Sequence, residues 1–183
     1  MATRTVRVLA SLLALTFIIL LVIYVTPQHP RRVDSVEISG TTQFQHQIGN
    51  SLMLLKTRSP QSYGVVTTYI GRIVQSKHSG MAAYETPPTL QLNDRTAFHS
   101  LTWCASSIAH DSIHSKLYID YLKQNARVGS VPNEVWTGAE VERRCCEHQT
   151  RVLQDVGAPL SEISWSARTN DPYWEVEYSK RDW

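Results

Sequence analysis

Two histidines one helical turn apart are the residues of this sequence best suited to metal chemistry. His110 and His114 lie in the stretch W-C-A-S-S-I-A-H-D-S-I-H-S-K-L-Y, which contains neither glycine nor proline and is typical of a helix. Their spacing of i and i+4 places both imidazoles on one helical face, where both can bind the same ion. Asp111 adds a carboxylate directly after the first histidine. The pattern therefore predicts a metal site with an acidic side chain beside it.

A third ligand is needed, because a catalytic zinc site usually has three protein ligands and an open position for water. A second helix is predicted after Gly138, and one stripe of it faces the core. That stripe consists of Glu142, Cys146 (or Cys145), Gln149 and Leu153. A buried carboxylate is costly without a partner, and a metal ion held by the two imidazoles would be one. Glu140 and Glu147 lie on other faces and are predicted to be solvated.

These motifs resemble those of the zincin superfamily of metallopeptidases. The pattern His-Asp-x-x-His is one methylene away from the zincin signature His-Glu-x-x-His, whose acid is the general base. In the gluzincin form, a Glu on a following helix completes the histidine pair. The chain looks similar to small secreted or membrane-anchored zincin-like proteins with the motifs H-[DE]-x-x-H-S-x-L-Y, E-x-x-[AC]-x-x-x-Q and L-x-x-x-G-A-P. The matching segments are His110–Tyr118, Glu142–Gln149 and Leu153–Pro159, within a resemblance that covers 59–159.

The resemblance implies a zinc-dependent hydrolase that acts on peptide or amide bonds. His110, His114 and Glu142 would be the zinc ligands and Asp111 would be the general base. The segment Thr89–Leu92, which the residues predict as a short edge strand, would flank the cleft, so that a substrate backbone could pair with it. Asp is shorter than Glu by about 1.5 Å of reach. That difference leaves three outcomes: a slow enzyme, a metal-binding relic, or a helix shifted towards the metal.

The sequence leaves open the role of one further side chain and allows two other functions. Tyr118, one turn beyond His114, either orients a ligand, stabilises an oxyanion or belongs to the core. In an HD-type phosphohydrolase, His110 and Asp111 would both bind metal, and the additional ligands would come from His78, His99, Asp120 or Asp155. In a non-catalytic binding or structural domain, His110, Glu142 and Gln149 would instead form a buried hydrogen-bonded network.

Composition predicts one domain with an accessory segment and excludes one class of partner. The chain has 183 residues, 42% of them hydrophobic and 19% charged, with a net charge of +2. Its basic residues are scattered, so nucleic-acid binding is excluded. The three cysteines, Cys104, Cys145 and Cys146, are too few for a disulfide framework or a cysteine-rich zinc site. They are predicted to be buried apolar residues, with a bridge from Cys104 as the alternative.

The predicted fold is mainly α-helical, an α+β arrangement with one short edge strand. Further helices are expected at 48–57, from Pro60 to about Gly80, at 97–124 and from Gly138 to the stop at Gly157-Ala158-Pro159. The predicted segments are a short tail (1–7), a transmembrane signal anchor (8–25), a tether (26–47), the zincin-like metal-binding domain (48–159) and an aromatic, charged tail (160–183).

The anchor prediction rests on eighteen uncharged residues, Val8 to Val25, which as a helix would span about 27 Å. Arg4 and Arg7 precede this run, and no convincing cleavage site follows it. The sequence therefore predicts a single-pass membrane protein, with the domain outside the cytoplasm.

Overall fold

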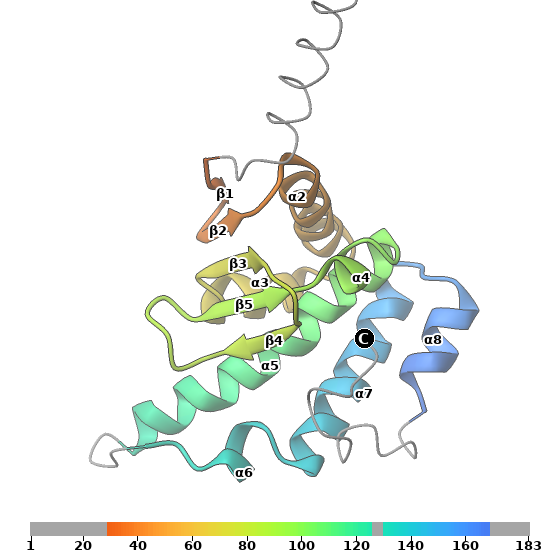
Figure 1. The fold of residues 1–183 in the computed structure, drawn as a ribbon. Helices are drawn as coiled ribbons and strands as arrows, with labels where there is room; N and C mark the ends of the chain where they lie inside the picture. The colour runs from red at the N-terminus through yellow and green to blue at the C-terminus, as the bar shows by residue number, and fades with distance from the viewer. Residues whose placement is uncertain (1–28, 126–129, 169–183) are drawn as a thin grey trace, which may run out of the picture.

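The computed structural model of the chain describes residues 29–125 and 130–168, and its central element is a long helix. This helix, α5 (Leu101–Gln124), packs against α2 (Thr42–Arg58) and α3 (Pro60–Tyr69), and also against α7 (Ala139–Asp155). Figure 1 shows α5 running diagonally behind the sheet, with α7 beside it. The shorter helices are α4 (Asp94–Ala97), α6 (Asn133–Trp136) and α8 (Leu160–Ser166). Helix α5 thus touches most of the other helices.

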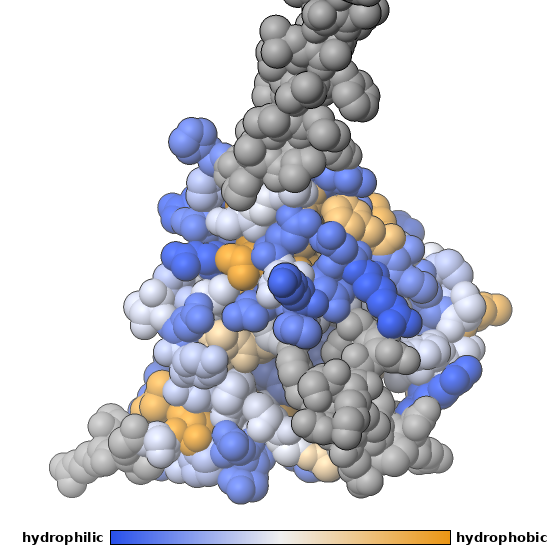
Figure 2. Space-filling view, viewed as in Figure 1, coloured by the Kyte–Doolittle hydropathy of each residue, from blue (hydrophilic) through white to orange (hydrophobic). Residues whose placement is uncertain are grey.

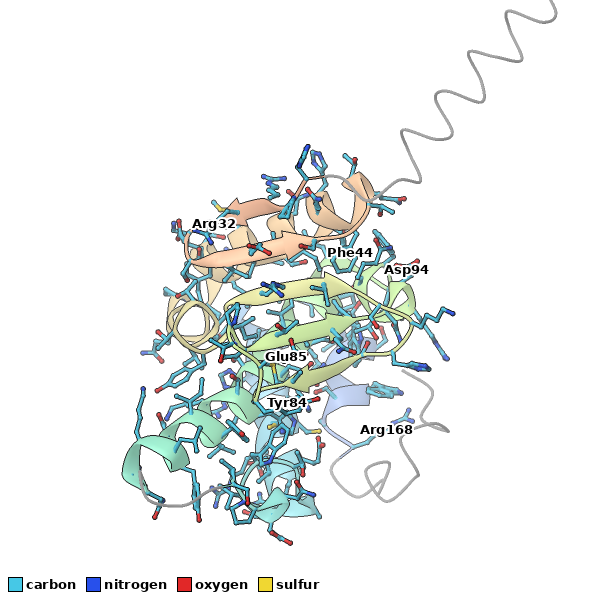
Figure 3. The ribbon with its side chains drawn as sticks, turned by 60° about the vertical axis from the view of Figure 1, so that its left-hand side comes forward. Arg32, Phe44, Tyr84, Glu85, Asp94 and Arg168 are labelled. Carbon is cyan, nitrogen blue, oxygen red and sulfur yellow. The ribbon has the colours of Figure 1, made fainter. Side chains whose placement is uncertain are left out.

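Five short strands form one mixed sheet in the order β1-β2-β3-β5-β4. The strands are β1 (Arg31–Val33), β2 (Val36–Ser39), β3 (Arg72–Gln75), β4 (Gly80–Ala82) and β5 (Thr89–Leu92). Strands β2, β3 and β5 are parallel, whereas β1 and β4 are antiparallel to their neighbours. In Figure 3 the strands are seen face-on, with Tyr84 just beyond the end of β4. Strand β4 is the edge strand that contacts α5.

The hydrophobic core lies between the sheet and the helices that cover it. Fully buried side chains come from β2, α2, β3, β5 and α5, among them Ile38, Phe44, Leu52, Ile73, Leu90 and Ile108. Figure 2 shows that the described surface on one face is mainly hydrophilic, with small separate hydrophobic areas. Burial of this apolar surface is the main force that holds α5 in place.

Side-chain caps fix where the helices begin. Ser100 accepts a hydrogen bond from Trp103 N at 2.8 Å and caps α5, and Asn93 caps α4 in the same way through Thr96 N. Pro60 occupies the first turn of α3, where its missing N–H costs nothing. The stretch predicted as one helix from 97 onward is therefore capped three residues later, at Ser100.

The predicted α+β arrangement dominated by helices is confirmed, but the prediction of a single short edge strand is wrong, because five strands form a sheet. The helix predicted beyond Pro60 ends at Tyr69, and the following residues form β3. Strands of three or four residues are too short to show a clear alternation of polar and apolar side chains. Thr89–Leu92 is a strand, as predicted, but it is not an edge, because β5 pairs with β3 on one side and β4 on the other.

The two ends of the domain also differ from the predicted boundaries. Most of the segment predicted as a tether (26–47) folds into β1, β2 and the first turns of α2. The first part of the predicted C-terminal tail forms α8, and 169–183 lie outside the described residues.

The structure corrects the prediction of a single-pass membrane protein with its domain outside the cytoplasm. Within 29–125 and 130–168, no helix is both long and apolar enough to cross a bilayer. The segment predicted as an anchor (8–25), like the tail at 1–7, lies outside the described residues.

Candidate metal centre

Helices α5 and α7 bring the predicted ligands together at the place where they pack against each other. His110 and His114 lie one turn apart on α5, and Glu142 lies in the first turn of α7. The side chains are largely buried, with exposed fractions of 14% for His110, 7% for His114 and 11% for Glu142. The i, i+4 spacing and the predicted inward stripe of α7 therefore both lead to the same point in the fold.

The three donor atoms form a nearly regular triangle. His110 Nε2 and His114 Nε2 lie 3.2 Å apart, and Glu142 Oε2 lies 3.4 Å from the first and 3.6 Å from the second. A tetrahedral zinc ion with ligands at about 2.0–2.1 Å requires its donor atoms to lie about 3.3–3.4 Å apart. The spacing of the three atoms therefore matches that of one face of a zinc tetrahedron.

The orientation of the His114 ring is set by a backbone carbonyl. Its Nδ1 lies 2.6 Å from the carbonyl oxygen of Trp136, at the end of α6. Because a carbonyl only accepts, Nδ1 carries a proton, and Nε2 is the nitrogen that faces Glu142 and His110 and that a metal ion would bind. The ring of Tyr118 packs edge-on against Trp136 at 5.1 Å between centroids. Metal-binding histidines are commonly fixed through their other nitrogen in this way.

The electrostatics of the cluster favour a cation. Burial alone lowers the pKa of His114, but the neighbouring Cys145 and Glu142 outweigh burial and raise it to about 10. The pKa of His110 is likewise raised, with burial opposing and Cys146 and Glu142 prevailing. Burial raises the pKa of Glu142, but the two imidazoles more than compensate and hold it below its usual value. The negative groups that raise these two pKa values would also attract a metal ion, which would have to displace the protons from the imidazole nitrogens.

One buried atom of the cluster is left without a partner. No hydrogen bond of ordinary geometry reaches His110 Nδ1 from the described part of the chain, nor the indole Nε1 of Trp136. Gln149 donates to Ser106 Oγ at 3.3 Å rather than to the histidine pair. The predicted network of His110, Glu142 and Gln149 is therefore incomplete.

A cavity of about 520 Å³ opens onto the ligands. Among its lining residues are the two histidines, Glu142 and Asp111, together with the whole of β4. Asp111 makes no hydrogen bond to any described residue, and burial raises the pKa of its carboxyl although the two histidines oppose the shift. The predicted acid therefore shares one chamber with the predicted ligands.

The edge strand beside the histidine cluster is β4, and Gln91 of β5 also lines the cavity although β5 lies inside the sheet. Gly80, Met81 and Ala82 line the cavity and form the outer strand of the sheet, with β5 as their only strand partner among the described residues. The prediction that Thr89–Leu92 offers a free edge to a substrate is therefore corrected. Among the described strands beside the site, the free edge belongs to β4, whose three residues are too few to show an alternation of polar and apolar side chains.

The other side chains predicted to take part in catalysis or metal binding lie away from the histidine cluster. Tyr118 is not among the residues that line the cavity, and it reaches the site only through its contact with Trp136. His78 and His99 are exposed. Asp120 is bound by Lys116 and Tyr69, and Asp155 accepts a hydrogen bond from Ser59. The additional ligands that an HD-type phosphohydrolase would need are thus engaged or turned to solvent.

Two contributors were not identified from the sequence. Cys145 is fully buried and forms a group with His110 and His114 that could hold a metal ion, since their donor atoms all lie within 4.8 Å of one another. The inward stripe of α7 contained a cysteine, but periodicity alone does not choose between two adjacent residues. The Trp136 carbonyl carries no sequence signal, because every residue has one. All three cysteines are buried, as predicted, and none of them forms a disulfide with a described residue.

Comparisons with protein-family models, with curated proteins and with solved structures found no match to this chain.

Proposed function

We propose that the chain is a zinc-dependent hydrolase of the zincin type that cleaves peptide or amide bonds. The observation that carries this proposal is the triangle of His110 Nε2, His114 Nε2 and Glu142 Oε2, with sides of 3.2, 3.4 and 3.6 Å. These are the distances that a tetrahedral zinc ion imposes on its ligands. A tetrahedral ion bound by these three atoms would have a fourth position for a water molecule or a further ligand.

A bound zinc ion would polarise the carbonyl group of the substrate and lower the pKa of a water molecule towards about 7. Asp111 would take a proton from that water, because it lines the same cavity and no hydrogen bond from a described side chain holds its carboxyl. His114 is held in place by the Trp136 carbonyl throughout.

The substrate class is supported by β4. An extended peptide backbone can pair with the free edge of a sheet, and β4 presents such an edge beside the ligands. Three residues of strand would align about 10 Å of backbone. A cavity of about 520 Å³ has room for one or two side chains of such a peptide.

The first test is the metal content of the full chain, measured by mass spectrometry after purification without added metal. We expect one zinc per wild-type chain and none in His114→Ala, because one of the three ligands is gone. His46→Ala, an exposed position on α2, is the matched control and should retain zinc. Absence of stoichiometric metal from the wild type would exclude the hydrolase and favour a non-catalytic domain.

A second measurement tests the reaction itself. Zinc-loaded chain incubated with a mixed peptide library should produce new peptide ends that mass spectrometry detects, and a chelator should abolish them. A chain that binds zinc and leaves the library intact is a metal-binding protein without peptidase activity.

A further inference from the structure

The wall of the site that faces away from the cavity holds a sulfur atom. Cys145 follows Glu142 by three residues on α7, so both side chains point towards α5. The thiol is fully buried, and Cys145 is not among the residues that line the cavity. It therefore approaches the histidines from a side that neither substrate nor bulk water occupies.

We propose that Cys145 is a further protein ligand of this metal ion and binds it through its sulfur, which gives the centre a donor set of two nitrogens, one oxygen and one sulfur. This inference rests on the proposed metal site and specifies its chemistry. The donor atoms of His110, His114 and Cys145 lie within 4.8 Å of one another. A zinc–sulfur bond of about 2.3 Å places the sulfur about 3.6 Å from nitrogen ligands in a tetrahedron.

The neighbouring cysteine is the natural comparison. Cys146 is also buried and lies close to His110. Of the two cysteines, however, only Cys145 belongs to the group of donor atoms that includes both histidines. Two adjacent residues on a helix point about 100° apart, so both cannot bind the same ion with good geometry. The geometry thus selects the first of the two cysteines.

A sulfur ligand has two consequences for this centre. Thiolate is a soft donor, so the site should prefer zinc or cobalt(II) strongly over magnesium, calcium or manganese. The sulfur also adds a fourth protein donor, so the ion must expand to five ligands when water enters from the cavity, as some catalytic zinc ions do in the transition state. A hydrolase with this donor set needs either that expansion or release of the sulfur.

When cobalt(II) replaces zinc, absorption spectroscopy can detect a sulfur ligand. The full wild-type chain loaded with cobalt should show the intense near-ultraviolet absorption of sulfur-to-cobalt charge transfer, together with the visible bands of a four- or five-coordinate ion. Cys146→Ser should retain this absorption, and Cys145→Ser should lose it while still showing visible bands. Persistence of the charge-transfer band in Cys145→Ser, or its loss in Cys146→Ser alone, would overturn the assignment.

The wild-type chain by itself provides a test that needs no variant. X-ray absorption at the zinc edge should show one sulfur neighbour at about 2.3 Å among lighter neighbours at about 2.0–2.1 Å. Zinc bound with only nitrogen and oxygen neighbours overturns the role of Cys145 and leaves the proposed hydrolase intact. A wild-type chain that binds neither zinc nor cobalt overturns both proposals.

Discussion

Two clusters of titratable side chains lie on neighbouring stretches of α5, and they differ in how their carboxylates are neutralised. In one, Asp120 is paired with Lys116 and accepts a hydrogen bond from the Tyr69 hydroxyl at 3.0 Å. In the other, Glu142 meets only imidazoles, at 3.4 and 3.6 Å. The first cluster is balanced by its own lysine, whereas the only basic groups that face Glu142 among the described residues are imidazoles, which are cationic only when protonated.

Burial makes this difference chemically important. The side chains of Lys116 and Asp120 are 40% and 26% exposed, so water screens their interaction. The second cluster is shielded from solvent, and an uncompensated charge there is much more costly. A bound metal ion removes that cost, because it satisfies the carboxylate and both imidazoles together. The comparison teaches that a cluster of charged residues indicates a bound ligand only where no side chain of the protein already neutralises its charge.

The largest effect in the buried cluster is expected from Asp111→Asn. The amide has the size of the carboxylate but cannot take a proton, so hydrolysis should fall by about 10²–10⁴-fold. Zinc content should be unchanged, because Asp111 is not one of the proposed ligands. Parallel measurements of metal content and of peptide cleavage check this expectation. Full activity in the variant would remove Asp111 from the role of general base and leave the metal site standing.

The next effect separates two glutamates that lie on the same turn of α7. Glu140 is hydrogen-bonded by Arg143 and Arg144 on the exposed face, whereas Glu142 faces the histidines. Glu142→Gln should weaken zinc binding by about 100-fold or more, because even the outer partners of metal ligands are worth about 10–100-fold. Glu140→Gln should leave the affinity unchanged.

Competition with a chromogenic chelator measures both affinities under one set of conditions. Equal losses in the two variants would mean that the negative charge of α7 acts at long range and that Glu142 is not a ligand. A loss confined to Glu140→Gln would move the third ligand to the exposed face.

The site could be predicted from the sequence further than the fold could. The i, i+4 histidines and the inward stripe of α7 depend only on helical periodicity, which long helices such as α5 and α7 display clearly. Gly138 and Gly157 mark the two ends of α7, close to where they were predicted. The ligands could therefore be selected without knowledge of the sheet.

The sheet could not be predicted from the sequence, because its strands are short and most of their partners are distant in sequence. Ile73 fits a helical stripe that begins at Tyr63, yet it lies in β3 and pairs with Ile38 and Leu90. Which strand becomes the edge is decided by this long-range pairing, so β4 could not be distinguished from β5 in advance. Tertiary contacts override local pattern in short elements.

The smallest effect is expected in the exposed cluster, from Asp120→Asn. Lys116 and Tyr69 lower the pKa of Asp120, so its carboxylate stabilises the folded chain above its ordinary pKa of 3.8, and this contribution is lost as the pH falls through the lowered value. At neutral pH the variant should lose about 0.2–1 kcal/mol of unfolding free energy, a loss that salt reduces. Denaturant unfolding at neutral pH and below pH 3.8 checks both statements, and the two chains should converge in acid. Zinc affinity should not change, since the carboxylate is already neutralised by its own lysine. A loss of zinc in Asp120→Asn would show that the two clusters are coupled along α5 and that the contrast between them does not hold.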